Sequence, residues 1–190
     1  NVTGITLSEE QRQFGLKLNG NNGATLLLQD AMQLKDRNDL PVGGFDKITS
    51  LEMAEHVGIL RYQEFLRIVH SILKDDGVLY FQVAGFRRHF LWDDLVWGMF
   101  LGEHIFPGAD ASCTIGWVTA QLERAGFEVQ RVSNLGSHYS KTLGQWLDIW
   151  QSNKTPMVAK YGDVAYRRWE VFLAWSQYCS NMGSSTVMMI

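Results

Sequence analysis

Short apolar runs alternate with helical patterns through the first half of the chain. Runs rich in β-branched residues predict strands at residues 2–7, 24–29, 45–51 and 78–84. After the first run, Ser8 caps a predicted helix that extends to about Leu18. Apolar residues at helical spacing predict another helix at 60–73, which the polar residues 74–77 are expected to end. Strands that alternate with helices favour parallel pairing and a doubly wound α/β sheet.

The second half of the chain has a different pattern, in which apolar and aromatic residues recur at helical spacing. This spacing predicts helices at residues 90–106, 115–125, 139–153 and 164–182. A strand at 127–135 and a last edge strand at 186–190 complete the predicted elements. The helical part at about 87–125 is interpreted as a lid within a single domain that spans residues 1–190.

Composition narrows the classes of function. The chain has 190 residues, 46% hydrophobic and 19% charged, as expected of one folded domain with a sizeable core. A formal net charge of −3 argues against nucleic acid as a partner, because phosphate binding requires a basic face. Cys113 and Cys179 form no disulfide framework and have no metal-ligand spacing, so no metal site is expected. No apolar run approaches the ~20 residues of a membrane-spanning helix.

The segment at residues 45–58 is the strongest candidate for a functional site. Its β-prone run ends at Leu51, and two carboxylates and a histidine follow before Gly58. In open α/β sheets, the residues just beyond the carboxyl end of a strand line the ligand crevice. Glu55 and His56 could therefore orient a base or hold the proton of a small anion. A helix-start carboxylate with His56 packed or exposed explains the same pair equally well.

Two other strand ends carry weaker signals. Thr6, Leu7 and Ser8, with Gln11 one turn later, lie where a strand meets a helix. The free amides of a helix N-terminus bind anionic or polyhydroxyl ligands, although an ordinary Ser8 cap explains this spacing too. Asp30 ends the next strand, where its carboxylate could accept a hydrogen bond from an adenine amino group or lie solvated.

Aromatic side chains in the second half allow two interpretations. The phenol of Tyr139 could hydrogen-bond a reacting group or anchor the helix that follows it. Trp92, Trp97, Phe100 and Phe106 could line an apolar tunnel whose ring faces stabilise a developing cation. Packing in a core is the more frequent explanation of such a stripe.

Together these segments resemble the cyclopropane-fatty-acid synthase family of S-adenosylmethionine-dependent methyltransferases, and within it the sphingolipid carbon-9 methyltransferases. The likeness covers nearly the whole chain. It rests on long motifs that follow the family's order at residues 2–8 with Gln11, 45–58, 104–112, 135–143 and 172–176. The resemblance implies a Rossmann-like class I methyltransferase sheet with helical insertions that form a lid.

The resemblance also implies roles for individual residues. Contacts with S-adenosylmethionine are carried over to Thr6, Leu7, Ser8, Gln11, Asp30 and Leu51. Glu55 and Tyr139 are placed at the reacting centre, where cyclopropane synthases hold a bicarbonate ion as proton acceptor. Gln82 joins this catalytic set at a position where those enzymes have a histidine. An amide can hydrogen-bond an anion but takes no proton near neutral pH, which puts the use of bicarbonate in doubt.

The implied reaction is methyl transfer from S-adenosylmethionine to a double-bond carbon of a long-chain lipid, with the sphingoid base of a glucosylceramide as the favoured substrate. A cyclopropane-fatty-acyl-phospholipid synthase and a non-catalytic lipid-binding protein are the alternatives. A lipid substrate implies a membrane surface as partner. The expected location is the endoplasmic reticulum membrane, with the catalytic domain in the cytosol.

The start of the chain also carries an expectation. Asn1 opens a predicted strand, and no initiator Met precedes it. Compared with the family, the first strand of the sheet, the glycine-rich cofactor loop and any membrane anchor are expected upstream of Asn1. We therefore expect a fragment that lacks one strand of its sheet and, alone, binds S-adenosylmethionine weakly or not at all.

Overall fold

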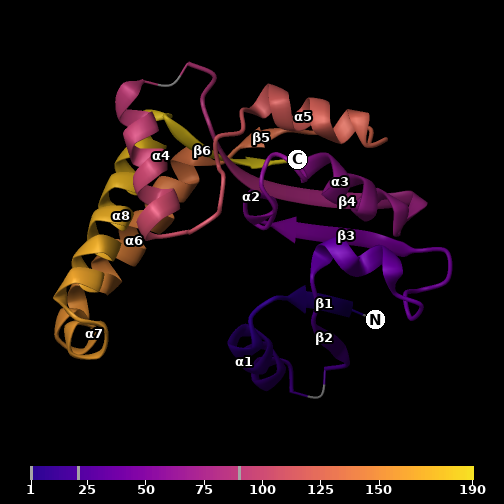
Figure 1. The fold of residues 1–190 in the computed structure, drawn as a ribbon, viewed down its shortest axis with the longest axis horizontal. Helices are drawn as coiled ribbons and strands as arrows, with labels where there is room; N and C mark the ends of the chain where they lie inside the picture. The colour runs from indigo at the N-terminus through magenta and orange to yellow at the C-terminus, as the bar shows by residue number, and fades with distance from the viewer. Residues whose placement is uncertain (1, 21, 90) are drawn as a thin grey trace.

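The computed structural model describes residues 2–20, 22–89 and 91–190, and it has a sheet region beside a group of long helices (Figure 1). The elements in chain order are β1 (Val2–Thr6), α1 (Glu9–Asn19), β2 (Ala24–Leu28), the 3₁₀ helix η1 (Ala31–Asp36), β3 (Phe45–Leu51), α2 (Ala54–Val57), α3 (Tyr62–Ser71), β4 (Leu73–Phe86), α4 (Trp92–His104), α5 (Ile115–Arg124), β5 (Ser133–Asn134), α6 (Gly136–Ser152), α7 (Lys154–Tyr161), α8 (Asp163–Met182) and β6 (Ser185–Met189). The predicted α/β class is confirmed.

The strands form two sheets in the described part of the chain. β1 pairs with β2 in parallel, and a second sheet has the order β3-β4-β6-β5. β3 and β4 are parallel, whereas β6 is antiparallel to both β4 and β5. In Figure 1, β1 lies on the side of β2 that is nearer to β3, and β3 ends on the side where α4, α6 and α8 lie. The parallel strands therefore present their carboxyl ends toward the long helices.

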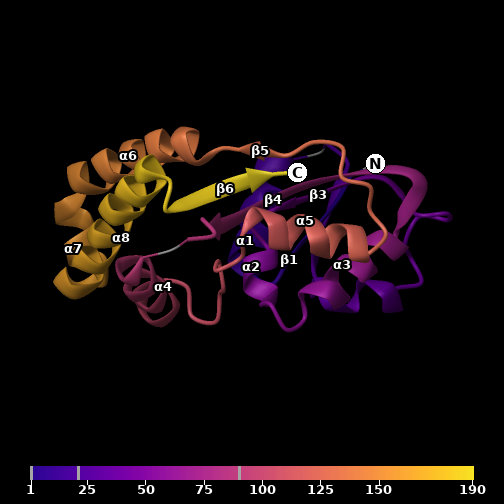
Figure 2. The same cartoon turned by 90° about the horizontal axis from the view of Figure 1, so that it is seen from above.

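The main core lies between the second sheet and the helices α3 and α5. α3 buries Phe65 and Leu66, at 1% and 0% exposure, against Phe81 and Val83 of β4. Val118 and Leu122 of α5 complete this cluster. Figure 2 shows α3 and α5 along the same face of the sheet. Each such side chain contributes about 1.5–3 kcal/mol through its burial, so this layer fixes the strand ends that carry the candidate site.

A second core holds the long helices together. Its buried residues are Trp97, Ile105, Leu143, Phe172, Leu173 and Cys179, which come from α4, from the residue that follows it, and from α6 and α8. The range 87–125, expected to be a lid, thus contains two helices with different neighbours, because α4 packs in this cluster and α5 packs beside α3. None of the helices among the described residues is long and apolar enough to cross a bilayer.

Three predictions about the elements were wrong. The polar residues 74–77 belong to β4, where they lie at an irregularity of the pairing with β3, between Leu73 opposite Phe45 and Val78 opposite Lys47. Of the strand predicted at 127–135, only Ser133–Asn134 forms a strand, and the Leu135 N–H donates to the carbonyl oxygen of Val187 in β6 at 2.7 Å. β6 is an inner strand rather than an edge strand.

The predicted long helices are confirmed with shifted ends. The prediction at 90–106 corresponds to α4, and its first residue, Phe90, lies outside the described residues. The predictions at 139–153 and 164–182 correspond to α6 and α8, and α7 between them was not predicted.

Candidate active site

A sharp turn follows the carboxyl end of β3. Glu52, directly after the strand, has φ of 49°, the one positive φ among the described residues other than glycines. This left-handed conformation costs a residue with a side chain about 1–2 kcal/mol. The Glu52 N–H donates to the carbonyl oxygen of Gln82 on β4 at 2.8 Å, so the turn is fixed to the neighbouring strand.

The side chain of Glu52 joins three elements that are distant in sequence. Gln82 Nε2 of β4 donates to Glu52 Oε1 at 2.9 Å. The Tyr139 hydroxyl of α6 donates to Glu52 Oε2 at 2.9 Å. Hydrogen bonds to a carboxylate are stronger than those between neutral groups, so this Glu52–Gln82–Tyr139 cluster has defined geometry.

Glu55 lies one helical turn further on, in α2, and it is buried with 5% of its surface exposed. Its Oε1 accepts a hydrogen bond from the backbone N–H of Ala84 in β4. Its Oε2 has no hydrogen-bond partner within the described part of the chain. Burial raises the pKa of Glu55 to about 7, the two backbone hydrogen bonds oppose this rise, and the negative charge of Glu52 adds to it. Near neutral pH, Glu55 is therefore a mixture of acid and carboxylate.

Tyr139 is held in its neutral form. Burial raises the pKa of its phenol, and the negative charges of Glu52 and Glu55 raise it further. The phenol consequently acts as a hydrogen-bond donor. The structure thus brings together Tyr139, Gln82 and Glu55, the three residues predicted as catalytic, around the carboxylate of Glu52.

The residues predicted to bind the cofactor follow the ends of β1, β2 and β3. Thr6 Oγ1 donates to Gln11 Oε1 at 2.7 Å and accepts from the Ser8 N–H at 3.1 Å. Ser8 caps α1 by accepting from the Gln11 N–H at 3.2 Å, so the cap interpretation of this motif describes its geometry. Leu7 is exposed after β1.

The two remaining cofactor predictions lie at neighbouring strand ends. Asp30 Oδ1 accepts from the Met32 N–H at 2.8 Å and caps η1. Leu51 is exposed at the last position of β3, next to Glu52. These residues therefore follow the ends of two parallel strand pairs in different sheets, and in Figure 1 β1 and β3 point in the same direction.

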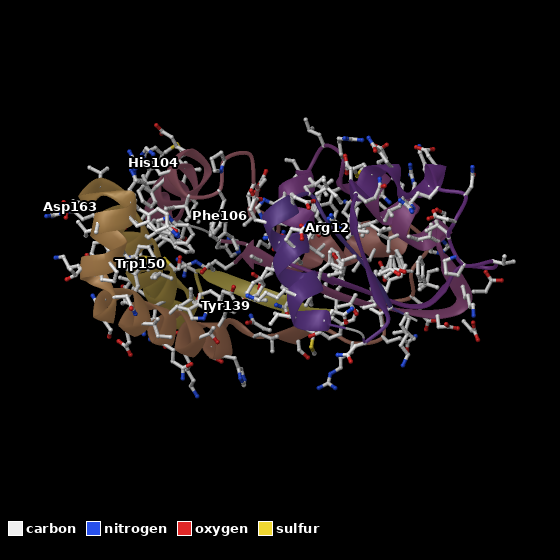
Figure 3. All side chains as sticks on the ribbon, turned by 90° about the horizontal axis from the view of Figure 1, so that it is seen from below. Arg12, His104, Phe106, Tyr139, Trp150 and Asp163 are labelled. Atoms are coloured by element: carbon white, nitrogen blue, oxygen red, sulfur yellow. The ribbon has the colours of Figure 1, made fainter. Side chains whose placement is uncertain are left out.

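The aromatic residues do not form one tunnel lining. Trp97 is buried and stacks on Phe100 with 5.0 Å between ring centroids. Trp92 is 73% exposed, so the interpretation of this residue as part of an enclosed lining is wrong. The ring of Phe106 packs edge to face with those of His56 and Phe172, with 6.2 Å and 5.3 Å between ring centroids. In Figure 3, the labelled Phe106 and Tyr139 lie on the side of the long helices that is directed toward α1.

Two outcomes concern the motif at 45–58. His56 is exposed and its ring contacts Phe106, whereas the Glu55 carboxylate is bound to Ala84, so the two side chains diverge. Glu52 was one of the two carboxylates noted in this motif, but no role was predicted for it. Its position directly after a strand is the signal that selects it.

A model of the family described as mycolic acid cyclopropane synthetase matches residues 1–190. The chain belongs to this family. It is 46% identical over 192 residues to sphingolipid C9-methyltransferase 2 of Gibberella zeae, covering 100% of this chain and 37% of the relative. It is 42% identical over 197 residues to sphingolipid C9-methyltransferase of Komagataella phaffii, covering 100% of this chain and 40% of the relative. The chain thus spans well under half the length of these curated relatives.

Solved structures of cyclopropane synthases share the fold of this chain. The cyclopropane synthase MmaA2 from Mycobacterium tuberculosis superposes with a TM-score of 0.88 at 26% identity, over 100% of this chain and 68% of that chain. The mycolic acid cyclopropane synthase CmaA1, complexed with SAH and CTAB, superposes with a TM-score of 0.87 at 28% identity, over 100% of this chain and 68% of that chain. The predicted family and the Rossmann-like class I methyltransferase fold are confirmed.

Proposed function

We propose that the protein transfers a methyl group from S-adenosylmethionine to a double-bond carbon of a long-chain lipid, with a sphingoid base as substrate. The observation that carries this proposal is the carboxylate of Glu52, held by Gln82 and Tyr139 at the strand ends, beside buried Glu55. Relatives named sphingolipid C9-methyltransferase support the sphingolipid substrate. The cyclopropane synthases among the structural neighbours support cyclopropane formation, which is the reaction of the alternative function.

The chemistry sets clear requirements for the site. An alkene is a poor nucleophile, so alignment of the double bond with the methyl donor supplies much of the catalysis. Attack leaves a positive charge on the neighbouring carbon, which water would quench, so the site must be dry. A base then removes a proton. Loss from the chain restores a methyl-branched alkene, whereas loss from the new methyl group closes a cyclopropane ring.

The strand ends fit the proposed cofactor. When bound, S-adenosylmethionine supplies an electrophilic methyl group on a sulfonium. Thr6, Ser8 and Asp30 offer hydroxyl and carboxylate oxygens suited to ribose and adenine. Leu7 and Leu51 offer exposed apolar surface, at 75% and 57% exposure, to a flat base. Gln11, bound to Thr6, orients this part of the site.

We also propose that α4 meets a membrane surface. Five apolar residues on one helical face are exposed, namely Leu91, Trp92, Leu95, Val96 and Met99. They recur at intervals of three and four residues, while Trp97 on another face enters the second core. An exposed apolar face of this kind is suited to the headgroup region that surrounds a lipid substrate.

The endoplasmic reticulum membrane, with the catalytic domain in the cytosol, is the proposed location, and fluorescence microscopy of the tagged protein tests it.

Lipid analysis tests the function directly. The protein is expressed from its complete coding sequence in a host whose sphingoid bases are unsaturated but unmethylated. A sphingoid base that gains the mass of one CH₂ group and is still cleaved by ozone supports the proposal. A gain confined to phospholipid acyl chains, with resistance to ozone, supports the cyclopropane synthase. An unchanged lipid profile with intact protein supports the non-catalytic alternative.

A further inference from the structure

The proposed reaction requires a proton acceptor, and most groups near the strand ends are poorly suited to this task. The phenol of Tyr139 is neutral and donates its proton to Glu52. The amide of Gln82 is not basic. His56 is exposed with its ring against Phe106. Glu55 is buried, with Oε1 held by a backbone N–H of β4, and its Oε2 has no hydrogen-bond partner among the described residues, so Glu55 is the rival of Glu52 for this task.

We propose that the carboxylate of Glu52 is the proton acceptor for the methyl-branched product, with Gln82 and Tyr139 as the residues that position it. This inference rests on the proposed function. The chain itself then supplies the carboxylate whose place the resemblance gave to a bicarbonate ion. Under this proposal Glu55, which lies in α2 after Glu52 and accepts a hydrogen bond from the Ala84 N–H, does not take the proton.

The proposed step balances as follows. The alkene electron pair forms the new carbon–carbon bond as the methyl–sulfur bond breaks, and sulfur keeps that bond's electrons as a neutral thioether. The methylated carbon then gives its proton to a Glu52 oxygen. The electrons of the broken carbon–hydrogen bond form the new double bond and neutralise the cation. The products are a methyl-branched alkene, S-adenosylhomocysteine and protonated Glu52.

The geometry of the cluster suits this step. Each Glu52 oxygen accepts one hydrogen bond, from Gln82 or from Tyr139, and keeps lone-pair capacity for a further proton. Glu52 is half-buried, and the donors from β4 and α6 fix its carboxylate on the protein. A negative charge at this place also stabilises the cation that precedes proton loss.

The backbone of Glu52 gives a second, independent observation. Its φ of 49° is a conformation that glycine adopts without strain. Strain of this kind persists at functional sites, where the surrounding structure fixes it. Glu52→Gly is therefore a suitable variant, because it deletes the carboxylate and leaves the turn unstrained. The side-chain N–H of Gln82 and the hydroxyl of Tyr139 remain as hydrogen-bond donors beside the space that the carboxylate filled.

The test uses the protein expressed from its complete coding sequence, with the wild type, Glu52→Gln, Glu52→Gly and the exposed Glu123→Gln as control. Glu52→Gln keeps an acceptor oxygen but no base, so we expect a loss of methyl-branched product of about 100-fold or more. Glu52→Gly should show the same loss, and added formate should restore product with a saturable dependence on its concentration. Calorimetry with S-adenosylmethionine should give unchanged affinity in all four proteins.

The outcomes separate this inference from the proposed function. Wild-type protein that makes no methylated lipid overturns the function and the inference with it. Active wild type with Glu52→Gln within tenfold of it overturns the inference alone. Glu52→Gly that binds S-adenosylmethionine normally and gains nothing from formate also overturns it, because Glu52 then has only a structural role.

Discussion

The buried carboxyl of Glu55 should make the stability of the protein depend on pH in a defined way. Its folded pKa is about 7, above the reference value of 4.5, because burial disfavours the charged form. For a pKa raised on folding, the stabilising contribution is complete below pH 4.5 and is lost as pH rises through 7. The shift of about 2.5 pKa units corresponds to roughly 3 kcal/mol between these limits.

Glu55→Gln isolates this contribution. Glutamine keeps an acceptor for the Ala84 N–H but cannot ionise, so other titrating groups cancel when the variant is compared with the wild type. The free energy of unfolding of Glu55→Gln minus that of the wild type should rise by roughly 3 kcal/mol between pH 4 and pH 8. Urea denaturation followed by circular dichroism at several pH values measures it, with Glu123→Gln as the control. A difference that stays constant with pH would refute the assignment of Glu55 as a buried group that resists ionisation.

Three further predictions follow from the strand ends and from α4. Tyr139→Phe removes the hydroxyl that positions Glu52, so turnover measured by lipid mass spectrometry should fall about tenfold or more, with little change in cofactor affinity. Tyr161→Phe, at an exposed residue, should leave turnover unchanged. Equal turnover of the two variants would count against the Glu52–Gln82–Tyr139 cluster. Ser8→Ala should lower the free energy of unfolding by about 1 kcal/mol in urea titrations, because α1 loses its cap. Trp92→Ser should reduce sedimentation with anionic vesicles, whereas Leu60→Ser, at an exposed residue of the turn before α3, should not. Identical sedimentation of the two variants would remove α4 as the membrane contact.

Much of the fold was predictable because its signals are local. The hydrophobic spacing of α3 and the cap at Ser8 are contained within a few neighbouring residues. The errors arose where distant pairing decides the structure. Residues 74–77 look like a helix stop, yet they lie within β4, whose pairing with β3 already begins at Leu73 opposite Phe45. The inner position of β6 depends on its antiparallel pairing with both β4 and β5, which no local pattern encodes.

The site shows the same division between local and distant information. Strand-end position and resemblance selected Glu55, Gln82 and Tyr139, which the structure gathers within one region. No role was predicted for Glu52, because its positive φ and its hydrogen bonds are visible only in the folded chain. Its two side-chain donors, Gln82 of β4 and Tyr139 of α6, lie 30 and 87 residues away in sequence. Trp92 has the same residue type and neighbourhood in sequence as Trp97, and only packing against α8 separates the buried ring from the exposed one.

The fate of a labelled methyl group tests the central claim most directly. The protein, expressed from its complete coding sequence in a host that contains unsaturated sphingoid bases, is supplied with methionine whose methyl group carries deuterium in place of hydrogen. If Glu52 takes the proton from the lipid chain, the methylated sphingoid base keeps every deuterium of that methyl group. A product that has lost one deuterium from the transferred carbon would mean that the new methyl group was deprotonated and a cyclopropane formed, which contradicts the account.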